Sequence, residues 1–154
     1  DMKNALMSFQ KQMMEKQQMK FQEVSETNKA KGEKYRTEFK NQPGVIELPS
    51  GILYKVIKES TGDKPKDTDT IVANYIGSFV DGKEFDNSYK RGEPIEFVVS
   101  GVIPGWTEIL QLMPVGSKWK AVIPPDLGYG EYGAAMIGPN ETLVFEIELL
   151  EIKK

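Results

Sequence analysis

The chain of 154 residues carries a formal net charge of −3 and contains neither cysteine nor histidine. This length allows one compact domain of about 100–150 residues with an appendage. The small negative charge gives no support to a general role in binding nucleic acid or membrane surfaces. Without cysteine, disulfides, thiol catalysis and zinc-thiolate sites are excluded. Without histidine, the commonest general base is missing, so metal-assisted or triad hydrolysis would depend on carboxylates alone.

The sequence shows neither a membrane-spanning pattern nor a signal peptide. No apolar run approaches the roughly 18 residues that a membrane span needs. The first residue is Asp1 rather than Met. We therefore expect a processed or truncated polypeptide whose targeting segment has been removed.

Residues 1–41 are predicted to form one long helix. The first 40 residues contain no proline and one glycine, and apolar side chains recur in steps of three and four. A helix of about 38 residues would be roughly 57 Å long, too long to lie on a domain of this size. We expect a projecting helix with a kink at Gly32.

This helix divides into two parts by composition. Residues 2–14 are rich in flexible apolar side chains, methionine above all, and are predicted to pack against another element. Because the chain offers no partner helix, that element would be a second copy or a missing N-terminal segment. Residues 15–40 are mostly polar and are expected to form a spacer. An ordinary solvated helix or coiled-coil arm is the alternative interpretation.

Residues 42–154 are predicted to form an α+β domain. Pro43 ends the helix, and β-branched and aromatic residues then alternate with polar ones in strand-like segments. Residues 104–112 are the only helical candidate in this part. We expect an antiparallel sheet of about five strands wrapped around this one short helix. The strand candidates cover residues 52–58, 70–80, 83–86, 95–99, 118–123 and 142–152.

The hairpin near residue 81 carries a conflict. Asp81-Gly82 predicts a two-residue type I′ turn. With that loop length, Tyr75 shares a sheet face with Asp86 but not with Phe85. If all three line one pocket, the ladder must break near residues 85–90, by a bulge or by the end of the strand. We predict that irregularity.

Residues 124–141 have no strand or helix signal. Loops longer than about 12–15 residues are usually functional or disordered. Because Tyr129, Tyr132, Met136 and Ile137 make this stretch too apolar to be merely solvated, we expect it to take part in the site.

Four motifs occur in order between about residues 48 and 152. They are Tyr75-x-Gly77-x-x-x-Asp81-Gly82-x-x-Phe85-Asp86, Val102-Ile103-x-Gly105-Trp106, Leu127-x-Tyr129-Gly130 and Thr142-Leu143-Val144-Phe145-x-x-x-Leu149-Leu150. These motifs resemble those of the FKBP family of peptidyl-prolyl cis-trans isomerases, in the same order and with nearly the same spacing. The helical front joined to such a domain resembles the bacterial Mip and FkpA subgroup.

The resemblance implies an isomerase that acts on proline-containing polypeptides, unfolded or partly folded, and has chaperone activity. It further implies a homodimer joined through the N-terminal helix, location in the periplasm or on the bacterial outer surface, and binding of macrolide inhibitors of the FKBP class. Rotation about an X–Pro bond breaks no bond, so neither a nucleophile nor a cofactor is needed. The alternative is a peptide-binding chaperone, or a surface virulence or adhesion module, in which catalysis is secondary.

The resemblance also assigns roles to residues. The Ile103 amide and the Tyr129 hydroxyl would donate hydrogen bonds to substrate carbonyls, and Asp86 would sit at the rim near the carbonyl carbon of the twisted amide. Without the motif, Trp106, Val102 and Ile103 fit core residues better than pocket residues. Asp86 alone is also consistent with a surface turn acid, but its place directly after the aromatic residue of the motif favours the functional interpretation. The predicted catalytic residues are Asp86, Tyr129, Ile103, Phe85 and Tyr75, and the predicted substrate-binding residues are Val102, Trp106, Ile137, Phe145 and Ile95.

Three positions depart from the family pattern. Ile95 stands where many relatives place an aromatic ring, so we expect an aliphatic wall that is less tight for macrolides. Residues 133–137 lack the Pro-Gly pair that relatives often have, and Glu131 adds a charge beside Tyr129. Both changes are expected to alter the preference for the residue before proline.

Overall fold

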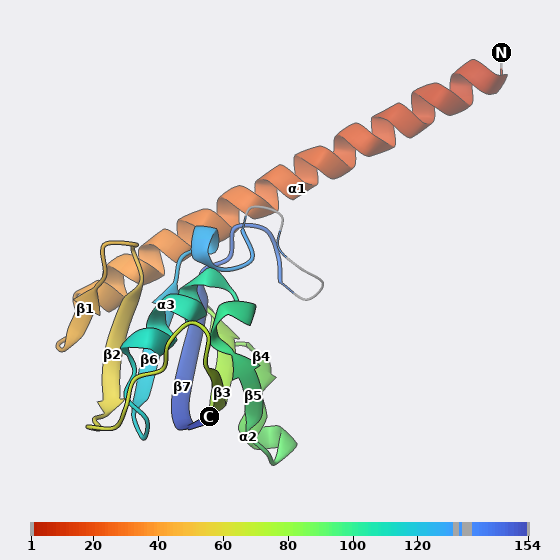
Figure 1. The fold of residues 1–154 in the computed structure, drawn as a ribbon. Helices are drawn as coiled ribbons and strands as arrows, with labels where there is room; N and C mark the ends of the chain where they lie inside the picture. The colour runs from red at the N-terminus through yellow and green to blue at the C-terminus, as the bar shows by residue number, and fades with distance from the viewer. Residues whose placement is uncertain (1, 131–132, 134–136, 154) are drawn as a thin grey trace.

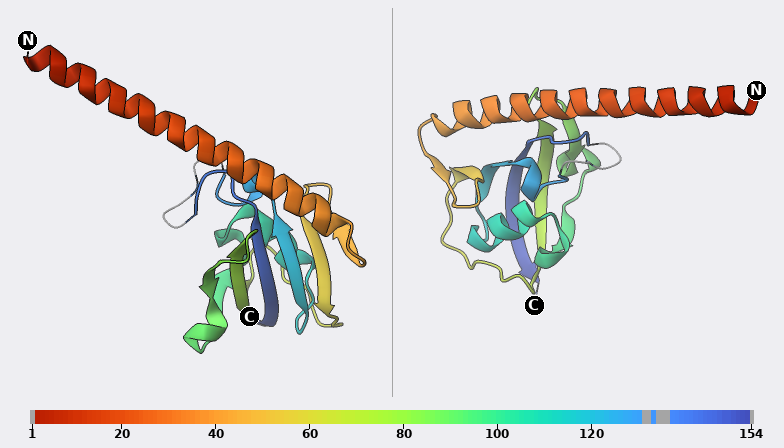
Figure 2. Two further views of the ribbon diagram at one scale, coloured as in Figure 1. Left: turned by 180° about the vertical axis from the view of Figure 1, so that it is seen from behind. Right: turned by 90° about the horizontal axis from the view of Figure 1, so that it is seen from above.

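The computed structural model describes residues 2–130, 133 and 137–153 of the chain. A long helix, α1, crosses one side of an α+β domain, and its N-terminal part extends well beyond that domain (Figures 1 and 2). The elements are α1 (Met2–Lys40), β1 (Val45–Glu47), β2 (Leu53–Lys58), β3 (Thr70–Phe79), β4 (Glu84–Asn87), α2 (Ser88–Arg91), β5 (Ile95–Val98), η1 (Val99–Gly101), α3 (Pro104–Leu112), β6 (Lys118–Ile123), η2 (Pro125–Leu127) and β7 (Leu143–Lys153).

The described strands form one antiparallel sheet of seven strands, one more than the six strand candidates in the sequence. Its order is β1-β2-β6-β7-β3-β4, and β5 also pairs with β3. Strand β4 pairs with residues 76–78 of β3, and β5 pairs with residues 70–73. The two short strands therefore lie one after the other along the same edge of β3. The sequence prediction missed β1 because three residues show no recognisable alternation.

Helix α3 covers the front face of the sheet, as predicted for residues 104–112 (Figure 1). Pro104 occupies its first turn, where the missing amide costs no hydrogen bond. Trp106, Ile109 and Leu110 point from α3 into the main hydrophobic core. Alternate residues of β7 fill the other side of this core, because successive side chains of a strand point to opposite faces. These are Leu143, Phe145, Ile147 and Leu149.

The prediction of a kink in α1 at Gly32 is wrong. The helix continues without a break from Met2 to Lys40 and is straight in both views of Figure 2. A Cβ atom at Gly32 would lie only 2.2 Å from Oγ1 of Thr142. Glycine is therefore needed at this position because the helix backbone approaches the domain closely, and it produces no bend.

The C-terminal part of α1 is no spacer, which corrects the expectation for residues 15–40. Phe39 is buried on the back face of the sheet against Leu53, Val122 and Val144. Burying one such ring stabilises the contact by about 1.5–3 kcal/mol. Helix position alone could not predict this docking, because the partners of Phe39 come from three separate strands.

The hairpin that joins β3 and β4 differs from a type I′ turn. Gly82 has a φ of +91°, but Asp81 does not adopt a positive φ. The Gly82 amide donates to the Phe79 carbonyl at 2.9 Å, and the Phe79 amide donates to the Lys83 carbonyl at 2.9 Å. The loop therefore has three residues and ends in the left-handed glycine that such loops favour.

The predicted break in the ladder is confirmed. Gly77 pairs with Asp86, whereas Ser78 pairs with Glu84, so that Phe85 is the extra residue of a bulge. Strand β4 then ends at Asn87, where α2 begins. The bulge allows Phe85 and Asp86 to lie at the same cavity.

Candidate active site

A cavity of about 490 Å³ opens on the front face between β3, α3 and the segment after β6. Its lining is mostly aromatic or aliphatic, with one carboxylate. The lining residues are Tyr75, Phe85, Asp86, Phe97, Gly101, Val102, Ile103, Trp106, Tyr129 and Phe145. Eight of the ten residues predicted for the site are therefore brought together by the fold.

The Trp106 ring forms the centre of the aromatic lining. It is only 4% exposed, and Tyr75, Phe97 and Phe145 contact it edge to face, with ring centroids 5.0–5.2 Å away. Edge-to-face pairs at such distances are favourable because the positive edge of one ring meets the negative face of another. The Trp106 indole N–H has no hydrogen-bond partner among the described residues. The rings thus form a rigid apolar cup.

Gly77 makes room for two of these rings. A Cβ atom there would lie 2.7 Å from Cζ of Phe85 and 2.9 Å from Cε1 of Phe145. Because glycine has no Cβ atom, the rings of Phe85 and Phe145 can meet at right angles, with centroids 5.7 Å apart. The glycine of the first motif is therefore required by close packing beneath the cup.

The carboxylate of Asp86 is held at the rim of the cup. It accepts short hydrogen bonds from the Tyr75 hydroxyl and from the Arg91 guanidinium, and a third from the Asn87 amide at 2.9 Å. Arg91 also lies over the Tyr75 ring, 5.9 Å from its centroid. Asp86 is thus fixed in one orientation by groups from β3, β4 and α2.

These contacts keep Asp86 ionised and Tyr75 protonated. Burial acts to raise the pKa of the Asp86 carboxyl, but the hydrogen bonds from Tyr75 and Arg91 outweigh it, and the pKa lies below its ordinary value. Burial, followed by the hydrogen bond to Asp86, raises the pKa of Tyr75 above 10.0. At neutral pH the Tyr75 hydroxyl is therefore a donor and the Asp86 carboxylate an acceptor.

Two residues that line the cup, Ile103 and Tyr129, carry hydrogen-bond donors. Ile103 caps α3, and its amide donates to no group among the described residues, whereas its carbonyl accepts from Trp106 and Thr107. Tyr129 lines the cavity and is 40% exposed. Both donors are thus available to a ligand carbonyl.

Two predicted residues do not line the cup in the described part of the chain. Ile137 is buried in the main core, and Ile95 packs against that core beside Ala73. The expected aliphatic wall is wrong, because Phe97, two residues further along β5, supplies an aromatic wall. Its position on the same strand face as Ile95 was a signal that the sequence already contained.

Arg91 was also missed. It lies in a four-residue helix, α2, whose sequence Ser88–Arg91 carries no helical periodicity. No sequence pattern places its guanidinium on Asp86. Glu131, Tyr132 and Met136, which the sequence singled out, lie outside the described residues.

The described residues contain no group of three or more acidic side chains that could hold a metal ion. Within the same residues, no helix is long and apolar enough to cross a membrane.

Two family models match the chain. The model described as "FKBP-type peptidyl-prolyl cis-trans isomerase" matches residues 62–150. The model described as "Domain amino terminal to FKBP-type peptidyl-prolyl isomerase" matches residues 1–56. The first match contains every residue that lines the cup.

Several relatives match almost the whole chain. "Outer membrane protein MIP" of Legionella longbeachae is 49% identical over 99% of this chain and 66% of its own length. "FKBP-type peptidyl-prolyl cis-trans isomerase FkpA" of Escherichia coli K12 is 46% identical over 99% of this chain and 57% of its own length. The chain thus spans somewhat less than two thirds of the length of these relatives.

Solved structures agree with this comparison. The crystal structure of FkpA from Escherichia coli superposes with a TM-score of 0.94 at 46% identity, over 99% of this chain and 72% of that one. A crystal structure of a peptidyl-prolyl cis-trans isomerase from Pseudomonas syringae gives a TM-score of 0.78 at 40% identity, over 84% of this chain and 96% of that one.

Proposed function

Because the chain belongs to the family of FKBP-type peptidyl-prolyl cis-trans isomerases, we propose that it accelerates rotation about X–Pro bonds in unfolded or partly folded polypeptides. One observation carries this proposal. It is the aromatic cup around Trp106, with an ionised Asp86 held at its rim by Tyr75 and Arg91.

The cup favours the twisted amide over its planar forms. Amide resonance sets a barrier of about 18–20 kcal/mol and separates charge in the planar state. A dry apolar cavity solvates that charge separation poorly, whereas the twisted state, which has lost resonance, is less affected. The proline ring would rest on Trp106, among the rings of Tyr75, Phe97 and Phe145.

The polar groups at the rim orient the substrate. The free Ile103 amide donates to one substrate carbonyl, and the Tyr129 hydroxyl donates to another, so that the peptide is held on both sides of the rotating bond. The Asp86 carboxylate lies near the carbonyl carbon of the twisted amide. Because Tyr75 and Arg91 already hold it, little reorganisation is needed during rotation.

An isomerase assay on a short X–Pro peptide tests this proposal. Asp86→Ala and Tyr129→Phe are each expected to lower kcat/KM by roughly tenfold or more. The first removes the carboxylate near the twisted amide, and the second removes a hydrogen bond that holds the substrate. Matched controls are Asp81→Ala in the hairpin loop and Tyr89→Phe on α2, whose tyrosine is also 40% exposed. Equal activity in all four variants would refute the proposal.

The aromatic wall supports binding of macrolide inhibitors of the FKBP class in the same cup. Phe97 takes part in edge-to-face contacts with both Tyr75 and Trp106, so an apolar ring system would be enclosed on three sides. Competition between such a macrolide and an X–Pro peptide is the expected result. Binding without competition would place the macrolide elsewhere.

The exposed apolar stripe on α1 favours a second activity. We propose that it joins two copies of the chain, and that the cleft between their domains binds non-native clients as a chaperone. The stripe consists of Leu6, Phe9 and Met13, with Met7 and Met14 beside them, whereas Met19 lies on the other side of the helix. All six side chains are 48% or more exposed. A stripe of this size on a helix is typical of an interaction surface.

The docking of α1 defines the right deletion for a test. Removing residues 2–24 spares the contacts that Ser25, Asn28 and Phe39 make with the domain. Light scattering is expected to give a dimer for the full chain and a monomer for the deletion, with loss of aggregation suppression. A monomeric full chain, or unchanged suppression, would contradict the proposal.

We further propose that the protein acts in the periplasm or on the bacterial outer surface, as the name of the Legionella relative supports. The division into residues 1–41 and 42–154 stays a prediction. Cell fractionation of the full-length parent protein would test the location.

A further inference from the structure

The middle of α1 is tied to the segment that leads into β7. The Asn28 side-chain amide donates to the Pro139 carbonyl at 2.9 Å. The Asn140 side-chain amide donates to the Ser25 hydroxyl at 2.6 Å. These two hydrogen bonds join parts of the chain that lie 111 and 115 residues apart.

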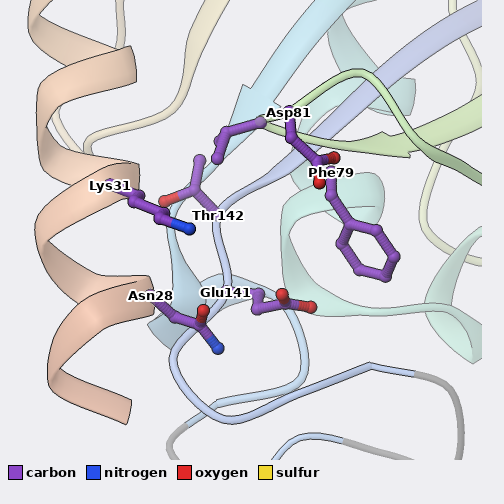
Figure 3. Close-up of a pocket in the computed structure, with 7 residues that line it drawn as sticks. Asn28, Lys31, Phe79, Asp81, Glu141 and Thr142 are labelled. Atoms are coloured by element: carbon purple, nitrogen blue, oxygen red, sulfur yellow. The ribbon is translucent and has the colours of Figure 1, made fainter. Parts of the chain in front are cut away.

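Close packing accompanies these hydrogen bonds. Figure 3 shows Asn28 and Lys31 of α1 facing Glu141 and Thr142 across a small cavity of about 160 Å³. Next to it, Gly32 lets the Thr142 hydroxyl approach the helix backbone. Residues 25–32, about two turns of α1, thus contact the segment 139–142.

Asn140 connects this contact to the cup. Its backbone amide donates to the Gly130 carbonyl at 3.0 Å, and the Gly130 amide donates to the Pro125 carbonyl at 2.8 Å. Gly130 directly follows Tyr129, whose side chain lines the cup. Asn140 therefore bonds to α1 through its side chain and to the backbone beside Tyr129 through its amide.

The backbone of Asn140 is suited to this double role. Its φ of +52° lies in the left-handed region, the only such value for a non-glycine residue among those described. Asparagine tolerates that region better than most residues, because its side chain bonds to nearby groups. The strained conformation directs its two donors toward different partners.

We propose that Asn140 is a positioning residue for Tyr129, and that α1 supports it through Ser25 and Asn28. This inference rests on the proposed isomerase activity. Asn140 does not line the cup, so it acts through Gly130 on the place of the Tyr129 hydroxyl. Helix α1 would then support the position of Tyr129 in addition to joining two copies of the chain.

The double variant Ser25→Ala/Asn28→Ala removes both side-chain bonds from the arm. Losing such hydrogen bonds is expected to lower kcat/KM on an X–Pro peptide by roughly three- to tenfold. The loss is expected mainly in KM, because Tyr129 holds the substrate. The matched control is Ser8→Ala/Asn4→Ala, on the exposed part of the same helix. Equal effects of the two double variants would overturn the proposal.

A double-mutant cycle separates positioning from general damage. In a Tyr129→Phe background the Ser25→Ala/Asn28→Ala change is expected to have almost no further effect, because the hydroxyl that it misplaces is already gone. Asn140→Gly, which keeps the positive φ, is expected to reproduce the effect and not to add to Ser25→Ala. Additive losses in either cycle would overturn the proposal.

Hydrogen exchange tests the link without using activity. The Asn140 amide is expected to exchange faster in Ser25→Ala/Asn28→Ala, while amides of β6 and β7 keep their rates. An unchanged Asn140 rate would overturn the inference. If the unmodified protein showed no isomerase activity, the proposed function and the positioning role of Asn140 would both be refuted. Faster exchange of the Asn140 amide would then show only a structural contact between α1 and the segment 139–142.

Discussion

The two faces of the sheet are built from the same strands, yet among the described residues the aromatic cup proposed as the site lies on the front face alone. Ala121 of β6 and Phe145 of β7 belong to the front core, and their neighbours Val122 and Val144 belong to the back cluster. On the back, α1 closes the packing with Phe39. On the front, α3 leaves a cavity of about 490 Å³ open among the rings. Burial of apolar side chains stabilises both faces of the sheet. The front face differs because its rings leave a cavity beside the fixed carboxylate of Asp86.

Removing one ring from each face should give the largest effects. Phe145→Ala and Phe39→Ala are each expected to lower the free energy of unfolding by about 3–5 kcal/mol, since each leaves a cavity. Only Phe145→Ala is expected to abolish isomerase activity in the folded protein. Urea unfolding followed by tryptophan fluorescence, with activity measured in low denaturant, checks both. Loss of activity in Phe39→Ala with normal activity in Phe145→Ala would contradict the assignment of the isomerase site to the front face.

Gly77→Ala should overpack the front face. The added methyl group would collide with Phe85 and Phe145, which is expected to cost about 1–3 kcal/mol of stability and to push rings into the cup. The control is Ser78→Ala at the neighbouring residue of β3, where no added atom is involved. Thermal unfolding and peptide affinity measure the difference. A Gly77→Ala variant with normal affinity would show that the two rings do not shape the cup.

Arg91→Ala should change the pH dependence of the front face. The Asp86 pKa lies below its ordinary value of 3.8, so its contribution to stability is present above that pH and is lost as pH falls through the folded pKa. Without Arg91 the pKa is expected to rise, and that loss begins at higher pH. The stability change at pH 7 is expected to be small, because the Arg91 side chain is exposed to solvent. Carbon NMR titration of Asp86 checks the direction.

The smallest effect is expected next to Arg91. Lys90 forms an exposed ion pair with Glu84 at 2.8 Å. Lys90→Ala is expected to change stability by less than about 0.5 kcal/mol and to leave the Asp86 pKa and isomerase activity unchanged. A Lys90→Ala variant that shifts the Asp86 titration as much as Arg91→Ala would mean that net charge near the rim matters more than the hydrogen bond.

The sequence predicted the front face better than the back. Alternation in residues 142–152 and the helical candidate 104–112 predicted the core and α3, because these features are local. The resemblance of four motifs to a known family predicted most of the cup. A conflict between strand register and the expected pocket predicted a break in the ladder near residues 85–90, which is the bulge at Phe85.

Sequence reasoning failed for Phe39 and Gly32, whose partners lie far away in the sequence. It also failed for Arg91, whose partner Asp86 is only five residues away, because the four-residue helix that carries Arg91 has no sequence pattern. It also assigned the wall of the cup to Ile95, whereas Phe97, two residues further along β5, lines the cup.

The most direct test of the cup as the site of isomerisation uses Trp106 as a reporter. Trp119 stacks on Tyr54 in the native protein, and phenylalanine at position 119 keeps an aromatic ring there. In the Trp119→Phe variant, Trp106 is the only tryptophan. An X–Pro peptide is then titrated while its cis–trans exchange rate is followed by NMR. The emission of Trp106 and the catalysed exchange rate are expected to saturate at the same peptide concentration. Catalysed exchange with unchanged Trp106 emission would place the reaction outside the cup.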